Sequence, residues 1–335
     1  MGVYIIAEAG VNHNGSMENA LKMIDAAKAC GCDCIKFQTF RASALVTQKA
    51  RKAEYQIENT HNSDSQYEML KKLELSSGNF FELKEYCDKV GIDFMSTPFD
   101  EESVEVLEQI GTKVYKISSG DITNKQLLQY VAKKHKPMII STGMCTLEEV
   151  QEAIGWIEQV GNTQITILHC TSNYPTPYED VNMKAMLTLD SQFPYPVGYS
   201  DHTKGYIIPV MAVAMGAEII EKHFTLDKNM EGPDHKASLD VAELKEMVDS
   251  IRIVEEAMGD GIKQPAKSEL STRDVARKSI ILTHAVPKGG VLTREDLGIK
   301  RPGNGLAPKY IDDLIGKKTL RKMESEELIA WEDVE

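Results

Sequence analysis

Eight short apolar segments separated by amphipathic stretches constrain the fold of this chain more than any other feature. The stretches between them, such as residues 17–29 and 147–160, place apolar residues at helical spacing. Strands that are apolar almost throughout are typical of a parallel sheet covered by helices, and eight unbroken alternations favour a closed barrel over an open sheet. The sequence therefore predicts an α/β fold, a (β/α)8 TIM barrel. Its strands are expected at residues 4–10, 32–40, 92–99, 113–120, 137–144, 164–172, 196–201 and 217–225.

The chain is longer than one barrel requires. Its 335 residues exceed the roughly 250 of a typical barrel, which leaves room for a small extra domain. Residues 259–274 are rich in Gly, Lys, Ser and Thr, and a linker is predicted over residues 261–277. The tail, 278–335, is too short for a large core of its own and is expected to dock on another surface. We predict a barrel domain over residues 1–260, followed by this linker and the small domain.

The composition of the chain indicates which classes of binding partner and which cellular compartment to expect. The net charge of −13 argues against a nucleic-acid or anionic-membrane partner, and no apolar run approaches the roughly 20 residues of a membrane span. The N-terminus has no basic region of the signal-peptide type, and the six cysteines lack CxxC spacing. We expect a cytoplasmic protein with reduced thiols, in which Cys145 and Cys170 pack rather than react.

Two histidines, His202 and His223, follow the seventh and eighth apolar segments. Because the C-terminal strand ends of a barrel converge on one mouth, two imidazoles from neighbouring strands make half of a divalent metal site. Mn²⁺ and Mg²⁺ both suit a site with few protein ligands. A third histidine, His169, is expected to be structural.

Lysines and hydroxyl side chains gather at the same strand ends. Lys36 and Lys116, together with several Ser and Thr side chains, would form a pocket for phosphate and carboxylate groups. The first strand brings Glu8 to the same mouth. Several ionisable groups are costly to bury without partners, which favours a ligand site. Two long segments, 41–66 and 226–238, follow the second and eighth strands, where loops of this length are usually functional.

Nine peptides in order resemble the sialic acid synthase family over residues 7–308. They are AEAGVNHNG, KFQTF, STPFD, YKISSGD, ISTGM, HCTSNYPTPYEDVN, GYSDHT, EKHFTLDKNMEGPDHKAS and KRPGNGLAP. The resemblance implies a TIM barrel followed by a C-terminal antifreeze-like (SAF) domain, which is swapped onto the partner's barrel in a homodimer. It also implies condensation of phosphoenolpyruvate and water with an N-acetylated mannosamine-type sugar, giving a 2-keto acid and phosphate.

The sugar is the open question at this point. We favour N-acetylmannosamine, with N-acetylneuraminate as the product. The alternative is 2,4-diacetamido-2,4,6-trideoxymannose, with N,N'-diacetyllegionaminate as the product. Pseudaminate-type and sugar-phosphate synthases fit less well, the latter because the sequence offers no further basic residues for a phosphate. A non-catalytic carbohydrate-binding protein fits least well.

The resemblance also implies residue roles. The phosphoenolpyruvate-binding residues would be Lys36, Gln38, Thr97, Lys116, Ser119, Ser141, Ser172 and Ser200. The sugar-binding residues would be Glu8, Asp121, Tyr174, Asp234 and, from the partner subunit, Arg301. The catalytic residues would be Glu8, Lys36, Lys116 and Asp121. His202 and His223 would bind a divalent ion that polarises the sugar carbonyl.

Some positions depart from the family pattern or stay open. Asp121 stands where some members have Glu, Ser172 where some have Asn, and Arg277 where some have Phe. Whether Glu8 is a base or an orienting group is left open. A loop asparagine that contacts the sugar would be Asn59 or Asn62.

Overall fold

A computed structural model describes residues 2–60 and 64–335, so Asn62 lies outside the described residues. The chain divides into two compact units, Met1–Gly259 and Asp260–Glu335. Each unit is described by itself.

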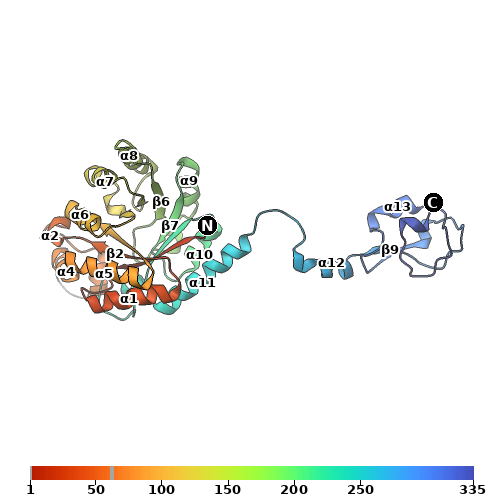
Figure 1. Cartoon of the computed structure of the whole chain (residues 1–335), viewed down its shortest axis with the longest axis horizontal. Helices are drawn as coiled ribbons and strands as arrows, with labels where there is room; N and C mark the ends of the chain where they lie inside the picture. The colour runs from red at the N-terminus through yellow and green to blue at the C-terminus, as the bar shows by residue number, and fades with distance from the viewer. Residues whose placement is uncertain (1, 61–63) are drawn as a thin grey trace. The chain divides into compact units, whose positions relative to one another are not determined.

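The first unit is a barrel of eight parallel strands in the order β3-β2-β1-β8-β7-β6-β5-β4. The two outermost strands in this order, β3 and β4, also lie against each other and close the ring. Helices surround the strands (Figure 1). The predicted (β/α)8 barrel is confirmed. Its strands are β1 (Tyr4–Gly10), β2 (Cys34–Thr39), β3 (Asp93–Pro98), β4 (Tyr115–Ile117), β5 (Met138–Ser141), β6 (Ile165–Cys170), β7 (Val197–Asp201) and β8 (Ile219–His223).

Most of the main helices of the barrel are amphipathic and begin at a polar capping residue, whereas α10 (Ile207–Ala214) is apolar throughout. Ser16, Ser76, Thr146 and Asp240, for example, each accept a hydrogen bond from the third residue of the helix that follows. The helices are α1 (Met17–Cys30), α5 (Ser77–Val90), α6 (Glu101–Gln109), α7 (Lys125–Ala132), α8 (Leu147–Glu158), α9 (Lys184–Gln192), α10 (Ile207–Ala214) and α11 (Val241–Met258).

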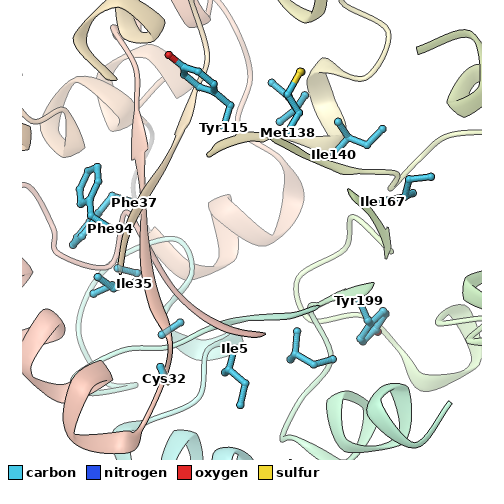
Figure 2. Close-up of a cluster of buried hydrophobic side chains, with 14 of the residues drawn as sticks. Ile5, Cys32, Ile35, Phe37, Phe94, Tyr115, Met138, Ile140, Ile167 and Tyr199 are labelled. Atoms are coloured by element: carbon cyan, nitrogen blue, oxygen red, sulfur yellow. The ribbon is translucent and has the colours of Figure 1, made fainter. Parts of the chain in front are cut away.

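Alternation along each strand divides the barrel core in two. One set of side chains, including Ile5, Ile35, Phe37 and Tyr199, points out to pack under the helices (Figure 2). The other set points inward, and its lower layer is an apolar plug. The plug consists of Ile6, Cys34, Met95, Ile139 and Leu168. Two residues further along each of these strands, the inward side chains are the polar ones that form the mouth of the barrel.

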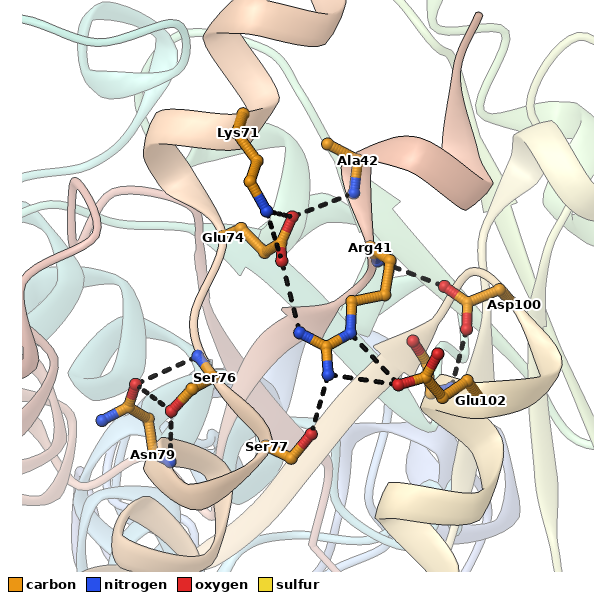
Figure 3. A network of polar contacts seen from close by, with 10 residues as sticks. Arg41, Ala42, Lys71, Glu74, Ser76, Ser77, Asn79, Asp100 and Glu102 are labelled. Carbon is orange, nitrogen blue, oxygen red and sulfur yellow. Dashed lines mark hydrogen bonds and ion pairs between the residues drawn. The ribbon is translucent and has the colours of Figure 1, made fainter.

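The long segment after β2 contains three short helices: α2 (Ala42–Leu45), α3 (Glu54–Thr60) and α4 (Gln66–Leu73). Arg41 anchors its start. The guanidinium lies 3.3 Å from Glu74 and 3.1 Å from Glu102, and it donates to the Ser77 hydroxyl at 3.3 Å (Figure 3). The backbone N–H of Arg41 donates to Asp100 at 3.2 Å. These contacts tie the segment to the helices on either side of β3.

The second unit has its own small core. Strands β9 (Ser279–Leu282) and β10 (Leu297–Lys300) pair antiparallel, and α13 (Ile311–Leu314) follows them. The core includes Ile280, Leu282, Leu292 and Leu314. Part of the segment predicted to be a linker is helical, because α12 occupies Leu270–Ala276. Over residues 2–60 and 64–335, none of the helices has the length and apolar character needed to cross a bilayer.

Candidate active site

A cavity of about 390 Å³ lies at the C-terminal ends of the barrel strands. The side chains that enclose its floor are the inward-pointing residues directly above the apolar plug. Twelve of the fifteen predicted site residues line it: Glu8, Lys36, Gln38, Thr97, Lys116, Ser119, Ser141, Ser172, Tyr174, Ser200, His202 and His223. The convergence of strand ends that the sequence implied is therefore present in the structure.

Four buried charges form the floor of this cavity. Lys36 Nζ lies 2.7 Å from Glu8 Oε2 and 3.6 Å from Glu221 Oε1. Lys116 Nζ lies 3.5 Å from the same Glu221 oxygen. The two lysines thus share one carboxylate, and both ammonium groups line the cavity, where they can interact with a further anion.

Hydroxyl and amide groups complete the floor. Lys36 donates to Thr97 at 3.2 Å, and Lys116 donates to Ser141 at 2.7 Å. Gln38 donates to Glu8 Oε1 at 3.3 Å. These contacts fix the two ammonium groups beside hydroxyls that can also donate to phosphate or carboxylate oxygens.

Burial sets the protonation of these groups. It raises the pKa of Glu8 to about 7, against the opposing charge of Lys36. Burial also lowers the pKa of Lys116. For Lys36, burial disfavours the ammonium, but Glu221 and Glu8 outweigh it and raise the pKa. A carboxyl group with a pKa near neutrality can either take up or release a proton during a reaction.

The two predicted metal ligands lie side by side at the mouth. The ring centroids of His202 and His223 are 5.5 Å apart. His202 Nδ1 is 2.7 Å from the Thr171 carbonyl, so this nitrogen carries the proton and leaves Nε2 as the ligand atom. His223 Nδ1 is buried and has no hydrogen-bond partner among the described residues. A buried polar atom is normally paired, so this nitrogen fits a site for a metal ion.

The protonation states of the two histidines are compatible with binding of a cation. Burial and the neighbouring His202 lower the pKa of His223 well below its usual range, which keeps the ring neutral and able to coordinate. Burial also opposes charge on His202, but the Cys170 sulfur and the Thr171 carbonyl outweigh it and raise the pKa, so an ion bound there would displace a proton. Within residues 2–60 and 64–335, no cluster of three or more His, Cys, Asp or Glu side chains could hold a metal by itself. The pair therefore fits an ion that takes its remaining ligands from water or substrate.

Three predicted residues do not line the cavity. Asp121 accepts a hydrogen bond from Ser118 at 2.7 Å, because the chain turns into a short 3-10 helix (Ser119–Asp121) after β4. Asp234 is buried, and its Oδ1 has no hydrogen-bond partner among the described residues; burial raises its pKa to about 6. Arg301 belongs to the second unit. The loop asparagine Asn59 donates to the Pro233 carbonyl at 2.6 Å, which uses its amide N–H₂ on the backbone.

The predicted roles left out several lining residues. Glu221 belongs to the predicted eighth strand, 217–225, but was assigned no role; it precedes His223 by two positions, so both side chains point inward. Cys170, expected to be a packing residue, lies 3.7 Å from His202 Nδ1 and lines the cavity. His169, expected to be structural, bonds the Val181 carbonyl at 2.8 Å. Tyr55 reaches the cavity from the segment after β2, and no motif or periodicity of that segment predicted it.

Comparison with known proteins gives consistent matches. The model of the NeuB family matches residues 23–263, and that of the SAF domain matches residues 277–335. The chain is 49% identical to the N,N'-diacetyllegionaminic acid synthase of Legionella pneumophila, over 100% of this chain and 95% of that protein. It is 47% identical to the Campylobacter jejuni protein of the same name, over 97% of this chain and 98% of that protein. The crystal structure of an N-acetylneuraminic acid (sialic acid) synthetase from Leptospira borgpetersenii superimposes with a TM-score of 0.72 at 36% identity, covering 81% of this chain and 90% of that one.

Proposed function

Because the chain belongs to the NeuB family, we propose that it condenses phosphoenolpyruvate and water with 2,4-diacetamido-2,4,6-trideoxymannose. The products would be N,N'-diacetyllegionaminate and phosphate. The enzyme class is that of the phosphoenolpyruvate-dependent nonulosonate synthases, which form a carbon–carbon bond. One observation carries the proposal: the two lysines that can bind an anion and the two histidines line the same cavity, with the lysines below the histidines.

The choice of acceptor is supported by the relatives and by the rim of the cavity. The two legionaminic acid synthases resemble the chain at 49% and 47% identity over nearly its whole length. The rim is lined by Tyr55, Phe99, Met144 and Tyr174, above the charged floor. Aromatic and thioether side chains suit a 6-deoxy methyl group and acetamido methyl groups better than free hydroxyls.

N-acetylmannosamine, which we favoured from the sequence although the motifs are compatible with either sugar, is the second candidate. The Leptospira synthetase, at 36% identity, supports it. A phosphorylated sugar has less support. Among the described residues that line the cavity, Lys36 and Lys116 are the only Lys or Arg side chains, and both contact buried carboxylates. None of the described residues at the rim of this barrel therefore offers a cation for a distal phosphate.

The floor accounts for the chemistry. Lys36 and Lys116, with Thr97 and Ser141, would hold the carboxylate and phosphate of phosphoenolpyruvate by charge and hydrogen bonds. C3 of the enol attacks C1 of the open-chain sugar, and the former carbonyl oxygen takes up a proton as the C–C bond forms. Water adds at C2 and gives up its protons to the new hydroxyl group and to the departing phosphate. The bond between C2 and the phosphate-ester oxygen breaks, so phosphate leaves and the 2-keto group forms. Glu8, whose pKa lies near neutrality, is placed to exchange a proton with the reacting groups or to orient them. A divalent ion held by His202 and His223 would supply positive charge at the sugar carbonyl oxygen.

The homodimer with a swapped C-terminal domain stays a prediction, as does the contribution of Arg301 to the partner's sugar site. The SAF match over residues 277–335 supports only the presence of the domain that would be exchanged. Size-exclusion chromatography with light scattering would measure the oligomeric state. Mixing inactive Glu8→Gln with inactive Arg301→Ala subunits tests the exchange. If the domain is swapped, the heterodimer contains one intact site, and activity returns after subunit exchange.

Phosphate release is the test of the proposed function. The enzyme would be assayed with phosphoenolpyruvate, Mn²⁺ and either 2,4-diacetamido-2,4,6-trideoxymannose or N-acetylmannosamine. We expect turnover that prefers the diacetamido sugar and stops when a chelator is added. A preference for N-acetylmannosamine would shift the assignment to N-acetylneuraminate. If neither sugar leads to phosphate release, both assignments of the acceptor are refuted.

A further inference from the structure

Helix α3 is held over the mouth of the barrel by contacts at its C-terminal end. Asn59 donates to the Pro233 carbonyl at 2.6 Å, which joins the segment after β2 to the one after β8. The buried Lys52 donates to the Thr60 hydroxyl at 2.9 Å. A side chain on α3 therefore has a defined position relative to the cavity although the helix has only one to two turns.

Tyr55 is the α3 side chain that lines the cavity. Its ring stacks on Tyr174, with centroids 5.1 Å apart and planes 28° from parallel. Tyr174 in turn packs on His202 at a centroid distance of 4.1 Å. The three rings form a column that leads outward from the histidine pair, and Tyr55 lies two ring spacings from His202.

The chemistry of Tyr55 suits an acylamino group. Burial, together with the charge of Asp234, raises the pKa of its hydroxyl, so the phenol stays protonated. That hydroxyl accepts a hydrogen bond from Gln56 at 3.3 Å and, among the described residues, donates none. Tyr55 thus offers an apolar face for a methyl group and a free O–H donor for a carbonyl oxygen.

We propose that Tyr55 recognises the acylamino group at C4 of the acceptor sugar and is a specificity-determining residue. The inference rests on the proposed function. With C1 of the sugar beside the histidines, the C4 substituent lies toward the outer end of the aromatic column. N-acetylmannosamine carries a hydroxyl at C4, so Tyr55 distinguishes the two candidate acceptors by contact with the acetamido group.

Steady-state kinetics with both sugars test this inference. For Tyr55→Ala we expect the KM of the diacetamido sugar to rise about 10-fold or more, because one apolar contact and one hydrogen bond are lost. The KM of N-acetylmannosamine should rise clearly less than that of the diacetamido sugar, because its C4 hydroxyl makes neither contact, and the KM of phosphoenolpyruvate, which would bind on the charged floor, is the internal reference. Tyr55→Phe, which keeps the ring, should show a smaller rise. Tyr178→Ala is the matched control, because Tyr178 is exposed, bonds the Lys204 carbonyl and does not line the cavity.

The outcomes separate the inference from the proposed function. If the wild type releases no phosphate with the diacetamido sugar, the proposed acceptor is wrong and the inference falls with it. If the wild type is active but Tyr55→Ala leaves that KM unchanged, or raises all three KM values alike, only the inference is wrong. Mn²⁺ affinity and the unfolding midpoint of each variant show that a raised KM does not come from a damaged site.

Discussion

Lys222 and Asp201 form a completely buried ion pair beside the two histidines of the site. Their charged atoms are 2.5 Å apart, and neither side chain is exposed. Each residue directly precedes a histidine, Asp201 before His202 and Lys222 before His223. Because neighbouring side chains on a strand alternate, the pair joins the ends of β7 and β8 from the outer face while His223 points into the cavity. The pair thus fixes the spacing of the two strand ends that carry the imidazoles.

Breaking this ion pair should damage both stability and metal binding. Lys222→Met leaves the Asp201 carboxylate buried without its cation, which is expected to cost about 3–5 kcal/mol of unfolding free energy. The double change Lys222→Met with Asp201→Leu should recover much of that loss, because no charge is left unpaired. Urea unfolding measures the stability, and electron paramagnetic resonance of Mn²⁺ measures the affinity, which should fall in the single variant.

A surface pair is the control for this experiment. Lys245 and Asp249 form an ion pair one helical turn apart on α11, with both side chains about half exposed. Lys245→Met should change the unfolding free energy by less than about 0.5 kcal/mol. If Lys245→Met and Lys222→Met lower the unfolding free energy equally, the buried pair does not have the special role of fixing the two strand ends.

Removal of either site histidine should abolish metal binding and turnover together. We expect His202→Ala and His223→Ala to lower Mn²⁺ affinity by more than about 100-fold, since even a lost outer partner of a ligand costs 10–100-fold. Calorimetric titration with Mn²⁺ alone checks this without substrate. His169→Gln is the control, because His169 bonds the Val181 carbonyl instead of lining the cavity. A carbohydrate-binding protein without activity would bind sugar equally well after His202→Ala, and that result would overturn the catalytic assignment.

Replacing either of two glycines by alanine should change the unfolding free energy, in opposite directions at the two positions. A Cβ at Gly198 on β7 would lie 2.4 Å from the Ile219 carbonyl oxygen and 2.8 Å from a Leu168 methyl group. Gly198→Ala should therefore lower the unfolding free energy by about 1–3 kcal/mol. At Gly155 in α8 a Cβ meets nothing within 4 Å. Gly155→Ala should raise stability by up to about 1 kcal/mol, because alanine favours the helix. Urea unfolding measures both changes. A stabilised Gly198→Ala variant or a destabilised Gly155→Ala variant would contradict the prediction.

The sequence predicted the barrel and most of its mouth because both depend on short-range periodicity. Alternation along a strand places Glu8 and Lys36 on the inner face, and the closure of eight strands brings them together. Tyr55 could not be found in this way. It lies on a helix of seven residues, Glu54–Thr60, whose position depends on contacts such as Asn59 with Pro233, 174 residues apart in the chain. Such contacts leave no periodic signal.

Asp121 shows the limit of placing residues by strand ends. The predicted strand 113–120 is only three residues long in the structure, Tyr115–Ile117, and the chain then turns. After the turn the Asp121 carboxylate accepts hydrogen bonds from Ser118 and Asn124, and Asp121 is not among the residues that line the cavity. The motif specified which residue types are present but not the path of the backbone after the strand, which hydroxyl and amide groups of the turn determine.

A buried histidine near the first loop predicts how stability depends on pH. His13 Nδ1 accepts a hydrogen bond from the Gly15 N–H at 3.0 Å, which requires an unprotonated nitrogen. Burial, with a smaller contribution from His235, lowers the pKa of His13 from its usual value near 6.5 to about 4. Between these two values the unfolded chain binds the proton and the folded chain does not, so the folded state loses stability as the pH falls.

The size of this effect follows from the two pKa values. Between pH 7.5 and 4.5 the wild type should lose roughly 2–3 kcal/mol more unfolding free energy than His13→Gln, which has no imidazole to protonate. Urea titrations followed by circular dichroism at several pH values would measure the difference. His135→Asn serves as the control, because His135 is exposed and its left-handed backbone, with a φ of 53°, also suits asparagine. Parallel pH profiles for the wild type and His13→Gln would show that His13 does not titrate differently in the folded chain.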